Sequence, residues 1–344
     1  MIKPKVFFQA VDESRDVERL KASFKHLLQQ SGICDDLPAG ELVPLKVHMG
    51  EKGNTSHVDG RVVKVLVDKL KARQVKPFVT DTNVLYQGRR VNAVDHLQLA
   101  AEHGFSLEKL GCPVIIADGI DGKNIVSIPA DYNHFKTVHV ASVFEKTQGF
   151  VIFSHFKGHM VSLFGGAIKN ISMGFASRAQ KQRMHSDYHP VLSKKKCTRC
   201  GVCVNICPTK AASISEPDYP EYDLQKCISC AQCIAMCPEM ALKIFWESDM
   251  TVFQEKLVET AAAVWKKIRQ KTIVINALLN ITVECDCLPG DNPVLNEDLG
   301  FVGGYHPVEV DEESLNITGA DIFEKAHPGV PWQRQFSYAR EIEF

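Results

Sequence analysis

The chain has 344 residues, of which 45% are hydrophobic and 24% charged, and its formal net charge is −1. This composition is typical of a globular protein with a sizeable core, and the near-neutral charge gives no reason to expect a nucleic-acid partner. The sequence lacks an apolar run of the roughly 20 residues that a membrane span needs. The short apolar patch near its N-terminus is unlike a signal peptide. We therefore expect a cytoplasmic protein.

Strands and helices alternate in the first third of the chain. Short apolar stretches predict strands over residues 6–10, 42–47, 77–80 and 114–117. Apolar residues at helical spacing follow the first three of these strands, over residues 17–28, 62–70 and 91–101. This alternation predicts an α/β fold with a largely parallel sheet and helices on both faces, in which the strand at residues 6–10 opens the first βα unit.

The rest of the chain departs from this alternation. Two strand-like pieces between residues 125 and 149 predict a hairpin, and residues 150–154 predict a buried central strand. Residues 178–189 are polar and basic, and we expect them to form a linker. Residues 253–268 predict an amphipathic helix and residues 272–277 a strand. For the remaining tail we expect one more helix and a partly irregular end.

The pattern C-x2-C-x2-C-x3-C-P occurs twice, at residues 197–208 and 227–238. In such a run three cysteines bind one [4Fe-4S] cluster, and the fourth, which precedes the proline, binds the other cluster. The two runs must therefore exchange ligands. We assign one cluster to Cys197, Cys200, Cys203 and Cys237, and the other to Cys227, Cys230, Cys233 and Cys207.

Zinc sites and disulfide bonds fit the eight cysteines less well than clusters do. Zinc sites close at four ligands, and cytosolic thiols are kept reduced, which argues against a disulfide framework. A structural role for the clusters, without electron transfer, stays open. Residues 192–245 resemble the bacterial two-cluster ferredoxins, and the resemblance implies a one-electron relay. We expect an α/β domain in two segments, 1–190 and 246–344, around an inserted ferredoxin-like 2[4Fe-4S] module at 191–245.

Several motifs outside the cysteines resemble one family. They are KVHMGEKGN, TDTNVLYQGRR, IIADGIDG, SHFKGHMVSLFGGAIKN and ECDC, in this order around the cysteine runs. They resemble the ferredoxin-containing branch of the family called domain of unknown function 362. The resemblance implies an iron-sulfur module on an α/β body and no particular reaction. One departure is His306, which stands where such proteins often have aspartate before a proline, and it leaves the role of Asp311 open.

Polar residues follow several predicted strands, where an open α/β sheet binds its ligands. The candidates for a site in this crevice are His155, His159, Cys285, Cys287, His48 and Glu51. Thiolates and imidazoles suit one further metal ion, iron, nickel or zinc, although His155 and His159 would equally form a satisfied structural pair. Asp81 and Asp118 also follow strands, where such residues are usually turn or capping residues. Cys34 and Cys112 are expected to be packing cysteines.

A second candidate set points to an anion. It consists of Lys157, Gly165, Gly166 and Lys169, in which the glycines would free backbone N–H groups for a phosphate or carboxylate. Tight packing at the glycines is the alternative. Tyr86, Arg89 and Arg90 would either hold an anionic substrate or form a solvated loop.

We expect an iron-sulfur redox protein whose clusters relay electrons to or from the crevice. Its partner would be a redox protein or a small-molecule electron donor or acceptor, and Lys194, Lys195 and Lys196 would steer an acidic protein. The alternatives are a non-catalytic electron carrier or adaptor, and a metal-dependent isomerase-like site. The last rests on the HFKGH and GGAIKN stretches, which loosely resemble nickel-dependent racemases.

Overall fold

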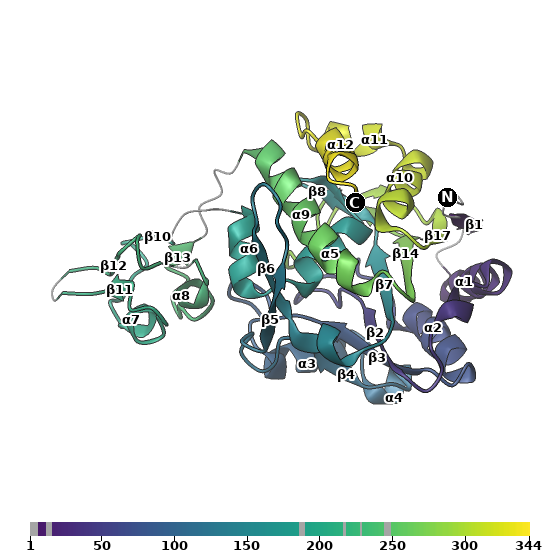
Figure 1. The fold of residues 1–344 in the computed structure, drawn as a ribbon, viewed down its shortest axis with the longest axis horizontal. Coiled ribbons are helices and arrows are strands. Elements are labelled where there is room, and N and C mark those ends of the chain that lie inside the picture. The colour runs from purple at the N-terminus through teal and green to yellow at the C-terminus, as the bar shows by residue number, and fades with distance from the viewer. Residues whose placement is uncertain (1–5, 12–15, 186–189, 216–217, 228, 244–248) are drawn as a thin grey trace.

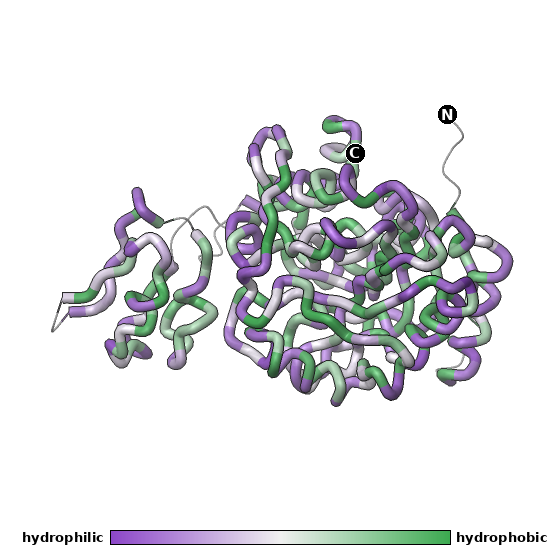
Figure 2. The backbone as a smooth tube through the Cα atoms, turned by 60° about the horizontal axis from the view of Figure 1, so that its bottom comes forward, coloured by the Kyte–Doolittle hydropathy of each residue, from purple (hydrophilic) through white to green (hydrophobic). Residues whose placement is uncertain are grey.

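The computed structural model describes residues 6–11, 16–185, 190–215, 218–227, 229–243 and 249–344. They form a large domain and a small lobe, which projects from one end of the large domain (Figures 1 and 2). The small lobe comprises the described residues between 190 and 243 and contains both cysteine runs. Among the described residues, no helix is long and apolar enough to cross a membrane.

The large domain is built on a seven-stranded sheet of order β1-β17-β14-β7-β2-β3-β4. The bounds of these strands are β1 Phe7–Ala10, β17 Gly300–Gly304, β14 Thr272–Leu278, β7 Phe150–His155, β2 Leu42–Lys46, β3 Lys76–Asp81 and β4 Val114–Ile116. The five strands from β14 to β4 are parallel, and β17 is antiparallel to both of its neighbours, so β1 runs in the same direction as the five. The largely parallel sheet is thus confirmed, and β1 with the helix α1 (Val17–Ser31) that follows it and packs against it forms the expected first βα unit.

Helices cover both faces of the sheet (Figure 1). Successive residues of β7 point to opposite faces, so Val151 and Phe153 pack in one core while Phe150 and Ile152 pack in the other. The helices of the large domain are α1 Val17–Ser31, α2 Gly60–Ala72, α3 Ala93–Glu102, α4 Leu107–Leu110, α5 Ala167–Phe175, α6 Arg178–His185, α9 Met250–Ile268, α10 Pro307–Thr318, α11 Ala320–Ala326 and α12 Gln333–Glu341. Every residue of β7 and β14 is buried, as expected for central strands.

Shorter elements complete the fold. The expected hairpin is present as β5 (Ile125–Pro129) and β6 (Thr137–Ala141). Two further antiparallel pairs, β8 (Lys157–His159) with β9 (Leu163–Gly165) and β15 (Ile281–Thr282) with β16 (Val294–Asn296), follow the carboxyl ends of β7 and β14. Two short 3₁₀ helices, η1 and η2, occupy Ile33–Asp36 and Ser142–Lys146.

Two sequence-based expectations were wrong. Residues 178–185 form the helix α6 with a largely buried face, instead of a linker, and residues 186–189 lie outside the described residues. The polar side chains of α6 are satisfied by loops distant in sequence, as when the Arg178 guanidinium donates to the carbonyls of Val84 and Asp121. The tail contains three helices, α10 to α12, which pack on the core beside α9 and bury Val310, Phe323 and Phe336.

The small lobe is a pair of short helices with two short ribbons. Its elements are β10 Val191–Leu192, α7 Val202–Asn205, β11 Ala212–Ser213, β12 Glu221–Tyr222, α8 Gln232–Ala235 and β13 Leu242–Lys243. The first and last strands of the lobe, β10 and β13, pair antiparallel, so the chain enters and leaves the lobe at neighbouring points. The expected module boundary at residue 245 lies outside the described residues.

Candidate functional site

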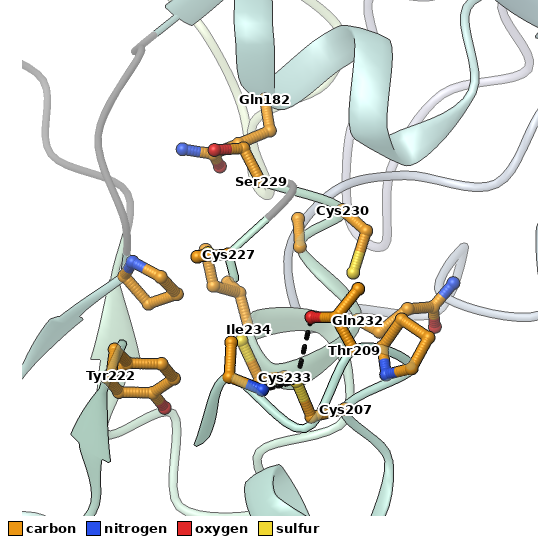
Figure 3. A pocket seen from close by; sticks show the side chains of 14 residues that line it. Gln182, Cys207, Thr209, Tyr222, Cys227, Ser229, Cys230, Gln232, Cys233 and Ile234 are labelled. Atoms are coloured by element: carbon orange, nitrogen blue, oxygen red, sulfur yellow. Dashed lines mark hydrogen bonds between the residues drawn. The ribbon is translucent and has the colours of Figure 1, made fainter. Parts of the chain in front are cut away.

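The eight cysteines of the small lobe surround two cavities. One cavity is lined by Cys207, Cys227, Cys230 and Cys233, and we call it the first cysteine cavity (Figure 3). The other is lined by Cys197, Cys200, Cys203 and Cys237, and we call it the second cysteine cavity. These are the two sets of the crossed assignment, because the fourth cysteine of each run lines the cavity of the other run.

The backbone of the lobe repeats an uncommon conformation at a 30-residue interval. The left-handed residues Arg199, Gly201 and Lys210 have counterparts in Ser229, Ala231 and Met240, with φ values between 47° and 73°. Five of these six residues are not glycine and therefore adopt this conformation at an energetic cost, of order 1 kcal/mol each. A backbone that repeats such turns around two cavities is shaped to wrap two similar groups.

Polar hydrogens point at the cysteine sulfurs. The N–H groups of Ala211 and Ala241 each donate to the sulfur four residues earlier, Cys207 and Cys237, at 3.2 Å. The phenol of Tyr222 interacts with Cys203 of one set and Cys233 of the other, and with burial the two sulfurs raise its pKa. Hydrogen bonds of this kind stabilise thiolates that bind iron-sulfur clusters. The residues around both cavities therefore fit a four-thiolate cluster each.

A site for a single metal ion has a different requirement, since its ligands must meet at one point. Among the residues described by the structure, no three His, Cys, Asp or Glu side chains are arranged to hold one metal ion. A [4Fe-4S] cluster is wider than one ion, so its four sulfurs do not need to converge in this way. The further metal ion thus stays a prediction without a ligand set in the described parts of the chain.

A third cavity, of about 850 Å³, lies between the carboxyl ends of the strands and the small lobe. We call it the central cavity. It falls within the range of ~300–1,000 Å³ that is usual for small-molecule sites. Most of the predicted crevice residues line it, namely His48, Glu51, Lys157, His159, Gly165, Gly166, Lys169, Cys285 and Cys287. The structure thus gathers these residues around one space, as the strand order predicts.

His155 is the exception. Its Nδ1 lies 2.9 Å from Asp286 Oδ2 and its Nε2 lies 2.7 Å from the carbonyl oxygen of Leu279. Lys157 Nζ stands 3.2 Å from the same Asp286 carboxylate. Both ring nitrogens of His155 face protein oxygens and are engaged within the protein, and the contact with Asp286 anchors the loop that carries Cys285 and Cys287. His155 is therefore a structural histidine, with both ring nitrogens hydrogen-bonded within the protein.

His159 is held differently. Its Nδ1 accepts a hydrogen bond from the backbone N–H of Ser162 at 3.1 Å, and its ring stacks on Phe253. Burial, and then the nearby Lys169, hold the pKa of His159 well below its usual range. A neutral imidazole therefore lines the central cavity.

The Cys285 sulfur lies beside the ammonium group of Lys169 in the central cavity. Lys169 Nζ lies 3.1 Å from Cys285 Sγ. A hydrogen bond from the Cys287 thiol, followed by the positive charges of Lys169 and Lys157, lowers the pKa of Cys285 well below its usual range despite burial. The same hydrogen bond raises the pKa of Cys287. The pair is thus a thiolate at Cys285 beside a thiol at Cys287, next to an ammonium group.

Gly166 lies in close packing, which the sequence left open as the alternative to an anion site. The N–H groups of Ala167 and Ile168, at the start of α5, donate to the carboxylate of Asp311 at 2.6 and 2.9 Å. A Cβ atom on Gly166 would lie 2.2 Å from Asp311 Oδ1. These N–H groups are therefore engaged with the protein's own carboxylate, and Gly166 allows its close approach. Asp311 also accepts from Asn276, and burial raises its pKa to about 6.

Buried charges line the central cavity, and sequence patterns did not single out two of them, Lys46 and Lys181. Lys46 Nζ pairs with Asp81 Oδ1 at 2.9 Å, and Arg90 Nε donates to Glu51 at 3.1 Å. Arg90 is 2% exposed, so it does not belong to a solvated loop. Lys181 on α6 lines the cavity from another side. Lys46 lies inside a strand and Lys181 in a uniformly basic stretch, so neither stood out in the sequence.

Single side chains separate the central cavity from the cysteine cavities. Ile234 lines both the first cysteine cavity and the central cavity. Leu242 lines both the second cysteine cavity and the central cavity. Both side chains are buried, at 4% exposure. Each cysteine cavity is thus one residue away from the space that Cys285 and Lys169 line.

Comparison with known proteins identifies a family that matches most of this chain. Residues 43–316 match the family described as Domain of unknown function (DUF362). A search of curated proteins finds no match.

Among solved structures, two similar chains have TM-scores below 0.5. A Thermotoga maritima protein is 12% identical with a TM-score of 0.44, and the match covers 90% of this chain and 57% of that one. The lactate racemase apoprotein from Thermoanaerobacterium thermosaccharolyticum is 9% identical with a TM-score of 0.45, covering 92% of this chain and 61% of the racemase. The match spans less than two thirds of either protein, and neither likeness extends to a site or an activity.

Proposed function

The chain belongs to the DUF362 family, a domain of unknown function, and from this premise we propose that it is an iron-sulfur redox protein. Two [4Fe-4S] clusters would be held in the small lobe, one in each cysteine cavity. They would relay single electrons to or from a reactant in the central cavity. Such clusters require thiolates, so the protein would work in a reducing compartment such as the cytoplasm.

One observation supports this proposal above the others: the eight cysteines surround two cavities in the crossed sets that two-cluster ligation requires. The cavities would place each cluster one side chain, Ile234 or Leu242, from the central cavity. A non-catalytic carrier has no need for a large polar cavity beside its clusters. The juxtaposition therefore favours an enzyme over a carrier or adaptor.

The residues of the small lobe and those of the central cavity would have different roles. The eight cysteines would bind iron, and the N–H groups of Ala211 and Ala241 would stabilise the thiolate charge of Cys207 and Cys237. When bound, the clusters would supply one-electron reduction or oxidation. Within the central cavity, Lys169 would hold Cys285 as a thiolate. Glu51, Arg90, Lys46 and Asp81 would fix the charge of the opposite wall.

Electrons would enter or leave through the outer side of the small lobe. Cys200 is exposed, so the second cysteine cavity is accessible to an external redox protein or small-molecule carrier. Lys194, Lys195 and Lys196 precede the first cysteine run and would attract an acidic partner.

Anaerobic purification followed by metal and sulfide analysis tests the proposal. We expect about eight iron and eight labile sulfide per chain, and reduction of both clusters by dithionite detected by electron paramagnetic resonance. Absence of iron, or clusters that dithionite does not reduce, would overturn the redox proposal. Any stoichiometric metal beyond the eight irons would support the further metal ion that the sequence predicts.

A further inference from the structure

The walls of the central cavity carry an excess of positive charge. Nine Lys and Arg side chains line it, against three Asp and Glu side chains. Carboxylates within ion-pair distance neutralise several of the cations: Lys46 pairs with Asp81, Arg90 with Glu51, and Lys157 with Asp286. Among the remaining cations on α5 and α6, the half-buried Lys169 faces a cysteine sulfur, and the buried Lys181 has no carboxylate within 4 Å among the described residues.

Lys181 is a buried cation without an ion pair among the described residues, because the carboxylates of Asp118 and Asp81 that favour its charge lie beyond ion-pair distance. Its ammonium group donates to Thr82 Oγ1 at 2.8 Å and to the carbonyl oxygen of Asn83 at 2.5 Å, which are neutral acceptors. Residue 181 is 8% exposed. A buried ammonium that meets only neutral oxygens is costly, and it has a third hydrogen to donate. An anion in the cavity would supply the missing negative charge.

The small lobe contributes an apolar patch to the cavity wall. The patch consists of Ile234, Met240 and Leu242, close to the cysteine runs, and Lys196 and Lys243 of the lobe also line the cavity. Met160 and Val161 of the large domain add further apolar surface. The cavity thus has buried or half-buried cations on α5 and α6 and an apolar patch toward the lobe.

We propose that the central cavity binds an organic oxyanion with an apolar body, whose charged group lies on Lys181 and Lys169 and whose body faces Ile234, Met240 and Leu242. The charged group would be a carboxylate or a phosphate, which share the chemistry that ammonium groups recognise. In this orientation the body of the ligand lies next to the cysteine cavities. Electron exchange between this apolar body and the clusters rests on the proposed function. Binding of the anion does not depend on the proposed function.

Isothermal titration calorimetry with simple probes tests this inference. Phenyl phosphate and benzoate combine an oxyanion with an apolar ring, inorganic phosphate lacks the ring, and benzyl alcohol lacks the charge. We expect phenyl phosphate, benzoate or both to bind at least about tenfold more tightly than inorganic phosphate and benzyl alcohol. Which of the two binds more tightly distinguishes a phosphate ester from a carboxylic acid. Equal binding of benzyl alcohol, equal binding of inorganic phosphate, or no binding of either aryl anion would overturn the proposal.

Two variants and a control locate the site. Lys181→Met should weaken binding of the better aryl anion at least about tenfold, since a hydrogen bond to a charged group contributes ~1.5–3 kcal/mol. Met240→Asp, at a position that is 53% exposed and therefore tolerant, should also weaken it by placing a carboxylate on the apolar patch. Lys109→Met changes an exposed lysine on α4 and should leave the affinity unchanged. Unaltered affinity in Met240→Asp, or in folded Lys181→Met, would overturn the placement.

The redox proposal and the anion site can be tested independently of each other. Iron content and dithionite reduction report on the clusters and do not depend on the anion. If both clusters form and are reduced but neither aryl anion binds, the anion site is wrong and the redox proposal stands. If an aryl anion binds to a protein that carries no iron, the anion site stands and the redox proposal is wrong.

Discussion

Asp311 on α10 accepts a 2.6 Å hydrogen bond from the backbone N–H of Ala167, the first residue of α5. The contact joins two parts of the chain that are 144 residues apart. Because α5 carries Lys169, this carboxylate also fixes where that lysine meets Cys285. A helix start that is open to an anion in many α/β proteins is closed here by the protein itself.

Replacing Asp311 by alanine should destabilise the large domain. The change leaves the N–H groups of Ala167 and Ile168 without their acceptor in a buried place, at ~1–3 kcal/mol for each. We expect a loss of about 2–5 kcal/mol in the free energy of unfolding, measured by urea denaturation. Glu312→Ala, on the same helix and paired with the exposed Arg340, is the control and should cost less than about 1 kcal/mol. Equal effects of the two changes would contradict the capping role.

The crossed cysteine sets predict which variants behave alike. Cys237→Ser should perturb the same cluster as Cys197→Ser, although the two residues belong to different runs. Cys207→Ser should group with Cys227→Ser for the same reason. Electron paramagnetic resonance of each reduced variant distinguishes the two clusters. A spectrum in which Cys207→Ser matches Cys197→Ser would show that each run binds its own cluster.

Tyr222 lines the first cysteine cavity, and besides burial the sulfurs of Cys233 and Cys203, one of each set, raise the pKa of its phenol, so its loss should affect both clusters. Tyr222→Phe removes the phenol that interacts with Cys203 and Cys233. Without this donor the more negative reduced state is less stabilised, and both reduction potentials should move to more negative values. We expect shifts below about 60 mV, which corresponds to a tenfold change for a one-electron couple. A redox titration measures them, and Tyr219→Phe is the control because its ring stacks on Lys194 and Arg199 instead.

Anion binding should weaken as the pH rises through about 8. Burial lowers the pKa of Lys181 to about 8, and the positive charges of Lys46 and Arg178 lower it further. The carboxylates of Asp118 and Asp81 have the opposite effect and raise this pKa. Below this pH the ammonium form is present and attracts the ligand, while above it the neutral amine does not. Benzoate is the suitable probe because its own charge is constant from pH 7 to 9.

Benzoate affinity is measured against pH in the unaltered protein and in Lys181→Met, and the slopes of the two curves are compared. The slope should be clearly negative in the unaltered protein and nearly flat in Lys181→Met. A slope that persists in the variant would assign the titration to a different group.

Sequence patterns predicted the sheet better than its surroundings. The strands β7 and β14 are buried on both faces, so their sequences are almost continuously apolar and easily located. The helix α6 has few apolar residues, and its buried Arg178 and Lys181 side chains donate to carbonyl groups of loops about 60 to 100 residues away. Periodicity along a sequence carries no information about such contacts.

The same limit applies to the site. Lys157, His159 and Cys285 were found because they follow strands, and parallel strands deliver such residues to one edge. Lys169 was found through the glycine pair that precedes it. The partner of His155 was not predictable, since Asp286 lies 131 residues away and faces it only in the folded chain. Gly166 was noticed for its conformational freedom, but its use is to admit the Asp311 carboxylate.

The pairing of β10 with β13 brings together the two ends of the segment that is inserted into the large domain. Val191 lies opposite Lys243 and Leu192 opposite Leu242, so the first and last described strands of the lobe lie side by side. An insertion whose ends are adjacent can be added or removed without moving the sheet that hosts it. A short loop in place of the lobe would leave the parallel strands and Lys181 where they are, and would open the central cavity to solvent along its apolar patch.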